Sequence, residues 1–190
     1  MVFWGSDEFE LIIKAQYEQK LEDLNCTFWR ESSCTYCVSP KGLTTAFKIN
    51  LFTSEINSRE KLISPNGNSL LSVAKFRIRQ VKLANSEYTV LGFINMKTLE
   101  TEFVVISTNE FVKKLSIREY GSKNSQIVNL RFWLMEDRSL FETVNMSLEG
   151  EWYFLSKGFN GRLADKEEWC FTSYLNNWGP LLVNLFKVDS

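Results

Sequence analysis

Residues 70–116 constrain the fold of this chain more than any other stretch. Three apolar segments, 70–83, 87–96 and 101–107, follow one another closely and predict three β-strands. A capped helix is expected directly after them, over residues 108–116. Strands that lead into a helix in this way predict a fold that combines both kinds of element.

The first of these strands carries polar side chains at its end. Side chains alternate between the two faces of a strand. One face therefore holds Phe76, Ile78, Gln80 and Lys82, and the other holds Arg77, Arg79, Val81 and Leu83. An amide and an amine thus project together from the end of an otherwise apolar strand. This arrangement is costly in a core and suits a site that handles phosphate groups.

An N-terminal helix and two more strands are expected before this region. Ser6 can cap a helix whose apolar residues recur at helical spacing. These residues are Phe9, Ile13, Tyr17, Leu21 and Leu24. Glu18 lies on the polar face of the same helix. Residues 26–30 predict a short strand, and residues 43–52 predict a longer one with Asn50 on its more polar face.

The C-terminal part predicts one more strand and one more helix. The strand is expected over residues 128–135. The helix is expected from Asp165 to Trp178, with Gly179-Pro180 ending it. The length of 190 residues predicts one domain over 1–190, in which residues from about 120 onward extend the core.

The composition restricts the classes of function. The chain has no histidine, which excludes serine–histidine and cysteine–histidine catalysis and histidine-ligated metal chemistry within it. With 22 basic and 23 acidic side chains the net charge is -1, so any nucleic-acid-binding surface must be local. The sequence shows neither a signal peptide nor an apolar stretch long enough to cross a bilayer. We therefore expect a cytoplasmic protein that does not contact a membrane.

The order of the predicted elements, together with Gln80-x-Lys82, resembles the PD-(D/E)XK nuclease superfamily. The resemblance covers roughly residues 8 to 115, in the order helix, strand, strand with Asn50, strand with Gln80 and Lys82, strand, strand, helix. It implies an α/β fold of restriction-endonuclease-like architecture, with a mixed β-sheet flanked by helices. The family's first acidic residue is expected near Asn50, and this chain has no aspartate there.

The resemblance also implies a set of site residues and a metal. Asn50 and Gln80 would be ligands of Mg²⁺ or Mn²⁺, and Glu18 would supply a carboxylate from the first helix. Lys82 would offset the negative charge that develops during phosphodiester hydrolysis. The implied function is that of a nuclease-like protein that binds DNA and hydrolyses phosphodiesters with a metal.

Two other functions fit the same sequence. The missing aspartate and the near-neutral charge favour a nuclease fold without catalysis, acting as an accessory subunit with a protein partner. The 15 phenylalanines and 6 tryptophans also fit an antiparallel β-barrel that binds a small apolar ligand, although they fit an ordinary core as well. The structural position of Asn50, Gln80, Lys82 and Glu18 distinguishes between these functions.

Two further patterns have alternative interpretations. Arg77 and Arg79 share a strand face and fit phosphate contacts, although a solvated sheet surface explains them equally well. Cys34 and Cys37 form a CxxC pair without a second such pair, which is not the usual spacing of a zinc site. We therefore expect free thiols at both positions.

Overall fold

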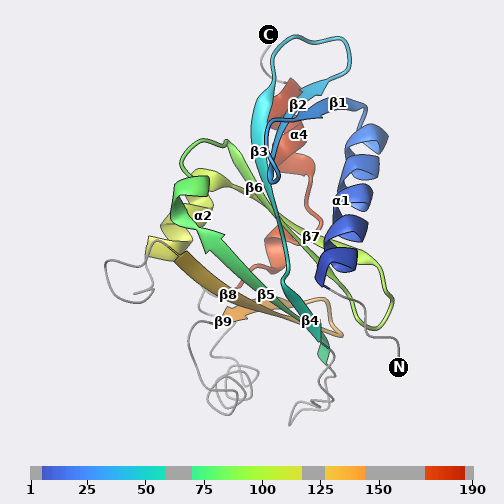
Figure 1. Cartoon of the computed structure of the whole chain (residues 1–190), viewed down its shortest axis with the longest axis vertical. Helices are drawn as coiled ribbons and strands as arrows, with labels where there is room; N and C mark the ends of the chain where they lie inside the picture. Colours follow the sequence, from blue (N-terminus) through green and yellow to red (C-terminus); the bar gives the residue numbers. More distant parts are fainter. Residues whose placement is uncertain (1–5, 59–69, 117–126, 144–169, 187–190) are drawn as a thin grey trace.

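The computed structural model describes residues 6–58, 70–116, 127–143 and 170–186, and Figure 1 shows their arrangement. The elements, in chain order, are α1 (Ser6–Asp23), β1 (Cys26–Arg30), β2 (Thr35–Pro40), β3 (Phe47–Thr53), β4 (Ile56–Ser58), β5 (Leu70–Arg79), η1 (Gln80–Lys82), β6 (Tyr88–Ile94), β7 (Thr101–Ser107), α2 (Thr108–Ser116), β8 (Ile127–Met135), β9 (Leu140–Thr143), η3 (Thr172–Tyr174) and α4 (Gly179–Phe186).

The strands form two sheets. The first sheet has the order β1-β2-β3-β6-β7, and the second has the order β4-β5-β8-β9. The β3–β6 pair is parallel, and every other pairing between these strands is antiparallel. Only Ser54 and Glu55 separate β3 from β4, so the chain passes from the first sheet into the second at this point.

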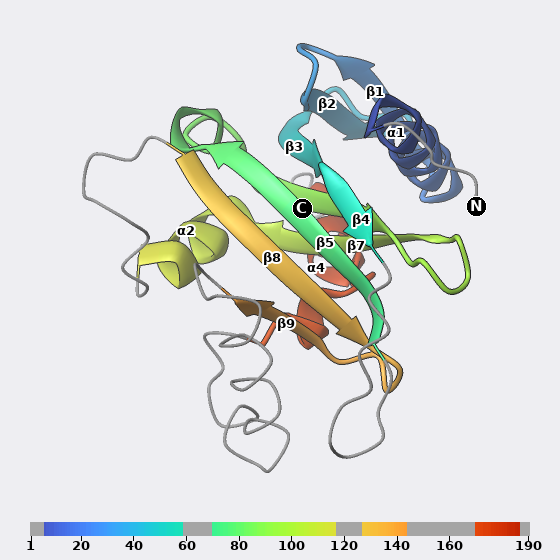
Figure 2. The same cartoon turned by 60° about the horizontal axis from the view of Figure 1, so that its bottom comes forward.

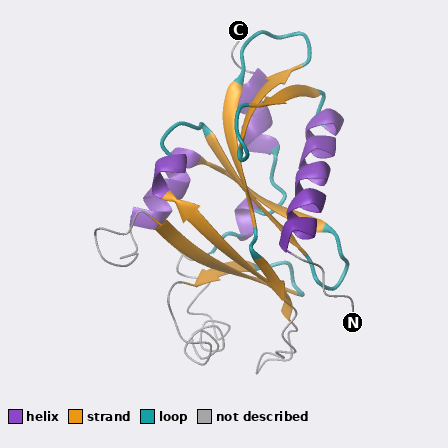
Figure 3. Ribbon diagram, viewed as in Figure 1, coloured by secondary structure: helices purple, strands orange, loops and turns teal. Residues whose placement is uncertain are grey.

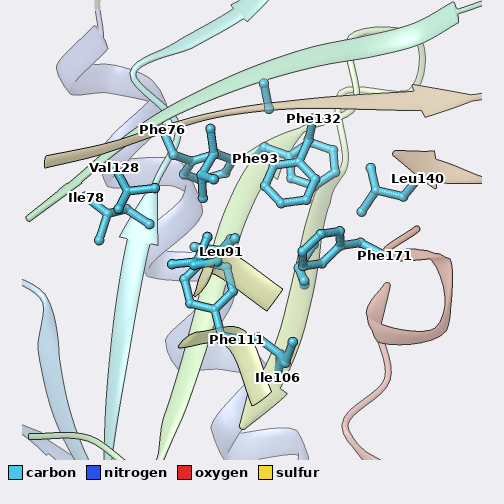
Figure 4. Packing of buried hydrophobic residues seen from close by; sticks show 14 of the residues in the cluster. Phe76, Ile78, Leu91, Phe93, Ile106, Phe111, Val128, Phe132, Leu140 and Phe171 are labelled. Carbon is cyan, nitrogen blue, oxygen red and sulfur yellow. The ribbon is translucent and has the colours of Figure 1, made fainter. Parts of the chain in front are cut away.

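One apolar core fills the space between the two sheets. Phe76 on β5 and Phe132 on β8 meet edge to face with ring centroids 5.7 Å apart. They pack with Leu91 and Phe93 of β6 and with Phe111 of α2 (Figure 4). Because β6 presents alternate side chains to its two faces, its remaining residues are free to form a second core.

The second core lies on the opposite face of the first sheet, under α1 and α4 (Figure 3). Ile13 and Tyr17 of α1 and Leu181 of α4 are fully buried there. The α1 helix approaches β6 closely at Gly92, where a Cβ atom would lie 2.4 Å from Ile13 Cγ2. A side chain at position 92 would therefore push α1 away from the sheet.

These features confirm an α/β fold with a mixed sheet flanked by helices. The predictions for the first helix, for 101–107 and for 108–116 are also confirmed. The described strands belong to two sheets rather than to one closed antiparallel barrel. None of the helices in the described residues is long and apolar enough to cross a membrane.

The prediction for residues 70–83 was wrong at its end. The strand stops at Arg79, and Gln80–Lys82 form a single turn of 3₁₀ helix. The family resemblance also implies that this strand pairs with the strand of residues 43–52, but the neighbours of β5 are β4 and β8. The physical reason is the switch of sheet at β4, which places β5 in the second sheet.

The C-terminal helix prediction was also wrong where the structure describes it. Residues 170–178 form two isolated β-bridges, at Cys170 and Leu175, and the turn η3, while residues 165–169 lie outside the described part. Gly179-Pro180 begins α4 instead of ending a helix. Proline suits the first turn of a helix because its missing N–H has no intrahelical acceptor there. The sequence interpretation also missed the strand β2.

Candidate functional site

A polar cleft of about 730 Å³ lies between β3 and the connection from β5 to β6. Its lining comes from three parts of the chain: Glu31, Ser32 and Thr35 around the start of β2; Lys48 and Asn50 on β3; and Val81, Lys82 and Ala84 to Glu87 in the connection. The cleft therefore contains two of the residues that the sequence singled out, Asn50 and Lys82.

Asn50 fixes the shape of this cleft through hydrogen bonds. Its side chain is only 2% exposed, and its Oδ1 accepts a hydrogen bond of 2.9 Å from Thr35 Oγ1. Its Nδ2 donates to the Lys82 carbonyl oxygen and, at 2.9 Å, to Ser86 Oγ. Ser86 in turn lies 3.1 Å from Thr108 Oγ1 at the start of α2. The hydrogen bonds of Asn50 thus hold the β5–β6 connection against the first sheet.

A salt bridge occupies the outer part of the cleft. Lys48 Nζ lies 2.7 Å from Glu31 Oε1, and both side chains are nearly half exposed. The hydrogen bond that Lys48 Nζ donates to the Glu31 carboxylate raises the pKa of Lys48. The Lys48 backbone N–H donates to Glu87 Oε2 at 2.6 Å. The cleft therefore combines two carboxylates with two ammonium groups.

Gln80 and Lys82 do not project together as the strand pattern predicted. In a 3₁₀ helix successive residues turn by about 120°, so residues two apart point in different directions. Both side chains are exposed, but Lys82 lines the cleft and Gln80 does not.

Glu18 lies on the other side of the first sheet. It accepts hydrogen bonds from Tyr36 Oη at 2.8 Å and from Arg30 Nε at 2.7 Å. Tyr36 belongs to the core under α1, and its neighbour Thr35 faces Asn50. Because side chains alternate along β2, the sheet itself separates Glu18 from Asn50.

The described residues of the cleft do not fit a Mg²⁺ or Mn²⁺ ion, because, of its two carboxylates, Glu31 pairs with Lys48 Nζ and Glu87 accepts a hydrogen bond from the Lys48 backbone N–H. Both cations favour carboxylate oxygens as ligands. Asn50 is neutral, and its amide group already has three hydrogen-bond partners. Within the described part of the chain no group of three or more histidine, cysteine, aspartate or glutamate residues is placed to hold a metal. The roles of Asn50, Gln80, Lys82 and Glu18 in metal-dependent cleavage stay predictions.

The CxxC residues lie at the start of β2. Cys34 is partly exposed and Cys37 is buried, and both are free thiols, as are the other two cysteines. Burial raises the pKa of Cys37, with nearby Glu31 adding to this effect. A raised pKa reduces the reactive thiolate fraction at neutral pH.

A row of cations lies on the outer face of the second sheet, which is turned to the viewer in Figure 2. Phe76 and Ile78 point into the core, so Lys75, Arg77 and Arg79 point outward from β5. Arg77 and Arg79 are exposed. The antiparallel register places Arg131 of β8 directly opposite Lys75. Within the described part of the chain no salt bridge involves Lys75, Arg77 or Arg79.

The sequence interpretation missed several cleft residues. Thr35 was read as part of the CxxC segment, and only the β2–β3 register places it opposite Asn50. Glu31 and Glu87 lie in loops without a recognisable motif, so no sequence signal connects them. The sequence does mark Val81, because it is an apolar residue between polar neighbours at the end of the predicted strand 70–83.

Comparison with known proteins finds a similar solved structure but no matching family. No known protein family and no curated protein sequence matches the chain. Among solved structures, a bacterial homing endonuclease, I-Ssp6803I, is similar with a TM-score of 0.41 and 11% sequence identity. The match covers 87% of this chain and 99% of that chain. A similarity at this level assigns neither a site nor an activity to this chain.

Proposed function

We propose that this protein binds DNA through the outer face of β5 and β8. The observation that carries the proposal is the row formed by Lys75, Arg77 and Arg79, with Arg131 opposite its first member. Residues two apart on a strand lie about 6.6 Å from each other, so their like charges repel. A polyanion that lies along the row removes this repulsion and gains charge-assisted hydrogen bonds.

The row is a local feature of a chain with no net positive charge. The chain as a whole carries a charge of -1, so a general attraction to polyanions does not explain binding. Lys82 lies three residues after Arg79, in the turn η1, and lines the cleft. The surface thus offers several cations in one direction, which is what contact with a phosphate backbone requires.

The test compares DNA affinity of matched variants at one salt concentration. We expect Arg77→Gln with Arg79→Gln to weaken binding of a labelled duplex at least about tenfold, since phosphate contacts supply much of the affinity. The control, Lys20→Gln with Lys41→Gln, removes the same charge from elsewhere and should retain wild-type affinity. Equal affinity of all three proteins, or no binding by the wild type, would contradict the proposal.

Cleavage is tested separately with the same protein. Because the described residues of the cleft do not fit a divalent cation, we expect intact DNA after incubation with Mg²⁺ or Mn²⁺. Metal-dependent cleavage that Lys82→Ala abolishes would instead support the nuclease role implied by the family resemblance.

A further inference from the structure

The turn η1 exposes an apolar side chain beside the cation row. Val81 is 69% exposed, more than any other large apolar side chain in the described residues. Its neighbours Gln80 and Lys82 are exposed as well, and Arg79 precedes them on β5. An apolar tip between cations resembles the wedges that DNA-binding proteins insert between base steps.

The cleft behind Val81 has the chemistry of a base-binding pocket rather than of a phosphate site. Lys48 and Lys82 balance the charges of Glu31 and Glu87 in its lining, so the cleft, unlike the cation row, carries no net positive charge to attract a phosphate. Its lining also includes the exposed Asn85 amide, which suits the neutral donors and acceptors on the edge of a base. Its volume of about 730 Å³ falls within the range of small-molecule pockets.

We infer that the cleft accepts one unstacked base of bound DNA while Val81 fills the gap in the base stack. This inference rests on the proposed function, because the cation row must first hold the backbone. Lys82 and Arg79 flank Val81 and would contact the phosphates on either side of the displaced nucleotide. Because the charges in the lining of the cleft balance, the phosphates would stay on the cation row and the neutral base would enter the cleft.

The experiment measures binding to two duplexes that differ at one position. One duplex is fully paired, and the other contains a single mismatched base. Extruding a mismatched base costs less than extruding a paired one, so we expect wild-type protein to prefer the mismatched duplex at least about fivefold. With 2-aminopurine at that position, binding should raise the fluorescence, because the base leaves the stack.

Two variants test whether the preference for the mismatched duplex depends on the Val81 side chain and on the cleft. Val81→Ser removes the apolar tip, and Ala84→Leu fills part of the cleft at an exposed position. Each should reduce the preference to less than about twofold while affinity for the paired duplex changes little, because that affinity comes mainly from phosphate contacts. Leu99→Ser is the matched control, because Leu99 is 63% exposed in the β6–β7 turn and lies outside the cleft.

The outcomes separate this inference from the proposed function. Tight binding of both duplexes with equal affinity and no change in fluorescence would overturn the inference and leave DNA binding intact. A preference that Val81→Ser and Ala84→Leu do not alter would overturn it too. Failure to bind either duplex would overturn the inference and the proposed function together.

Discussion

Replacing Asn50 by aspartate separates the nuclease interpretation from the structural role that the contacts assign to this residue. In the nuclease interpretation, Asn50→Asp restores a missing metal ligand and should improve metal binding. In the structure, the Asn50 amide nitrogen donates to the Lys82 carbonyl oxygen and to Ser86 Oγ. An aspartate would place an oxygen where a donor is needed, at a site that is 2% exposed.

The contacts of Asn50 set the size of the expected effect. The Ser86 hydroxyl can rotate to donate to the new carboxylate, but the Lys82 carbonyl oxygen loses its partner and faces a negative charge. An unsatisfied buried polar group costs about 1–3 kcal/mol, and burial of a charge adds to this. We therefore expect Asn50→Asp to lower the free energy of unfolding by about 2–4 kcal/mol at pH 7.

The loss of stability in Asn50→Asp should increase with pH. Burial raises the pKa of the introduced carboxyl group in the folded protein above the unfolded value of about 3.9. A protonated carboxyl group can donate to the Lys82 carbonyl oxygen again. The destabilisation should therefore be small below about pH 4 and should grow as the pH rises through the folded pKa.

Urea denaturation at several pH values measures this directly. Asn85→Asp is the control, because it adds the same charge to the lining of the same cleft at an exposed position. We expect it to cost less than about 0.5 kcal/mol, as is usual for surface substitutions. If Asn50→Asp is as stable as the wild type at pH 7, or if Mg²⁺ stabilises it selectively, the structural role is refuted and the nuclease interpretation is favoured.

Three further predictions concern packing, charge and the cysteines. Gly92→Ala should destabilise the protein by about 1–3 kcal/mol through the clash with Ile13, and Ile13→Ala should cost less in that variant than in the wild type. Burial would raise the pKa of Glu102, but hydrogen bonds from Arg138 and from two amides outweigh burial and lower it. Arg138→Met should thus cost about 2–4 kcal/mol at pH 7, and less as the pH falls and Glu102 becomes protonated, which denaturant titrations will show. Elemental analysis of protein purified without chelator should find no stoichiometric zinc on the CxxC pair; zinc whose removal unfolds the protein would contradict this.

The regular elements were predictable because their signals are local. The α1 helix repeats apolar residues at helical spacing, and the strand Thr101–Ser107 contains the continuous apolar run 103–106 next to a cap. The sheet assignment of β5 was not predictable in this way. It depends on the two-residue connection between β3 and β4, and nothing in that short segment specifies a change of sheet.

The candidate site was predictable only in part for the same reason. The strand pattern indicates Lys82 and the family resemblance indicates Asn50, and these two residues do meet at the cleft. The contact between them was not expected, because Asn50 binds the backbone oxygen of Lys82 and not its ammonium group. Glu18 was placed with them by family resemblance, although the alternation along β2 puts a sheet between them.

The salt dependence of DNA binding tests the proposed binding surface most directly. Each phosphate contact contributes about -0.9 to the slope of log K against log salt concentration. We predict that Arg77→Gln with Arg79→Gln reduces the magnitude of this slope by about 2, while Lys20→Gln with Lys41→Gln leaves it unchanged. Equal slopes for the wild type and the Arg77–Arg79 variant would show that the outer face of β5 does not contact the phosphate backbone.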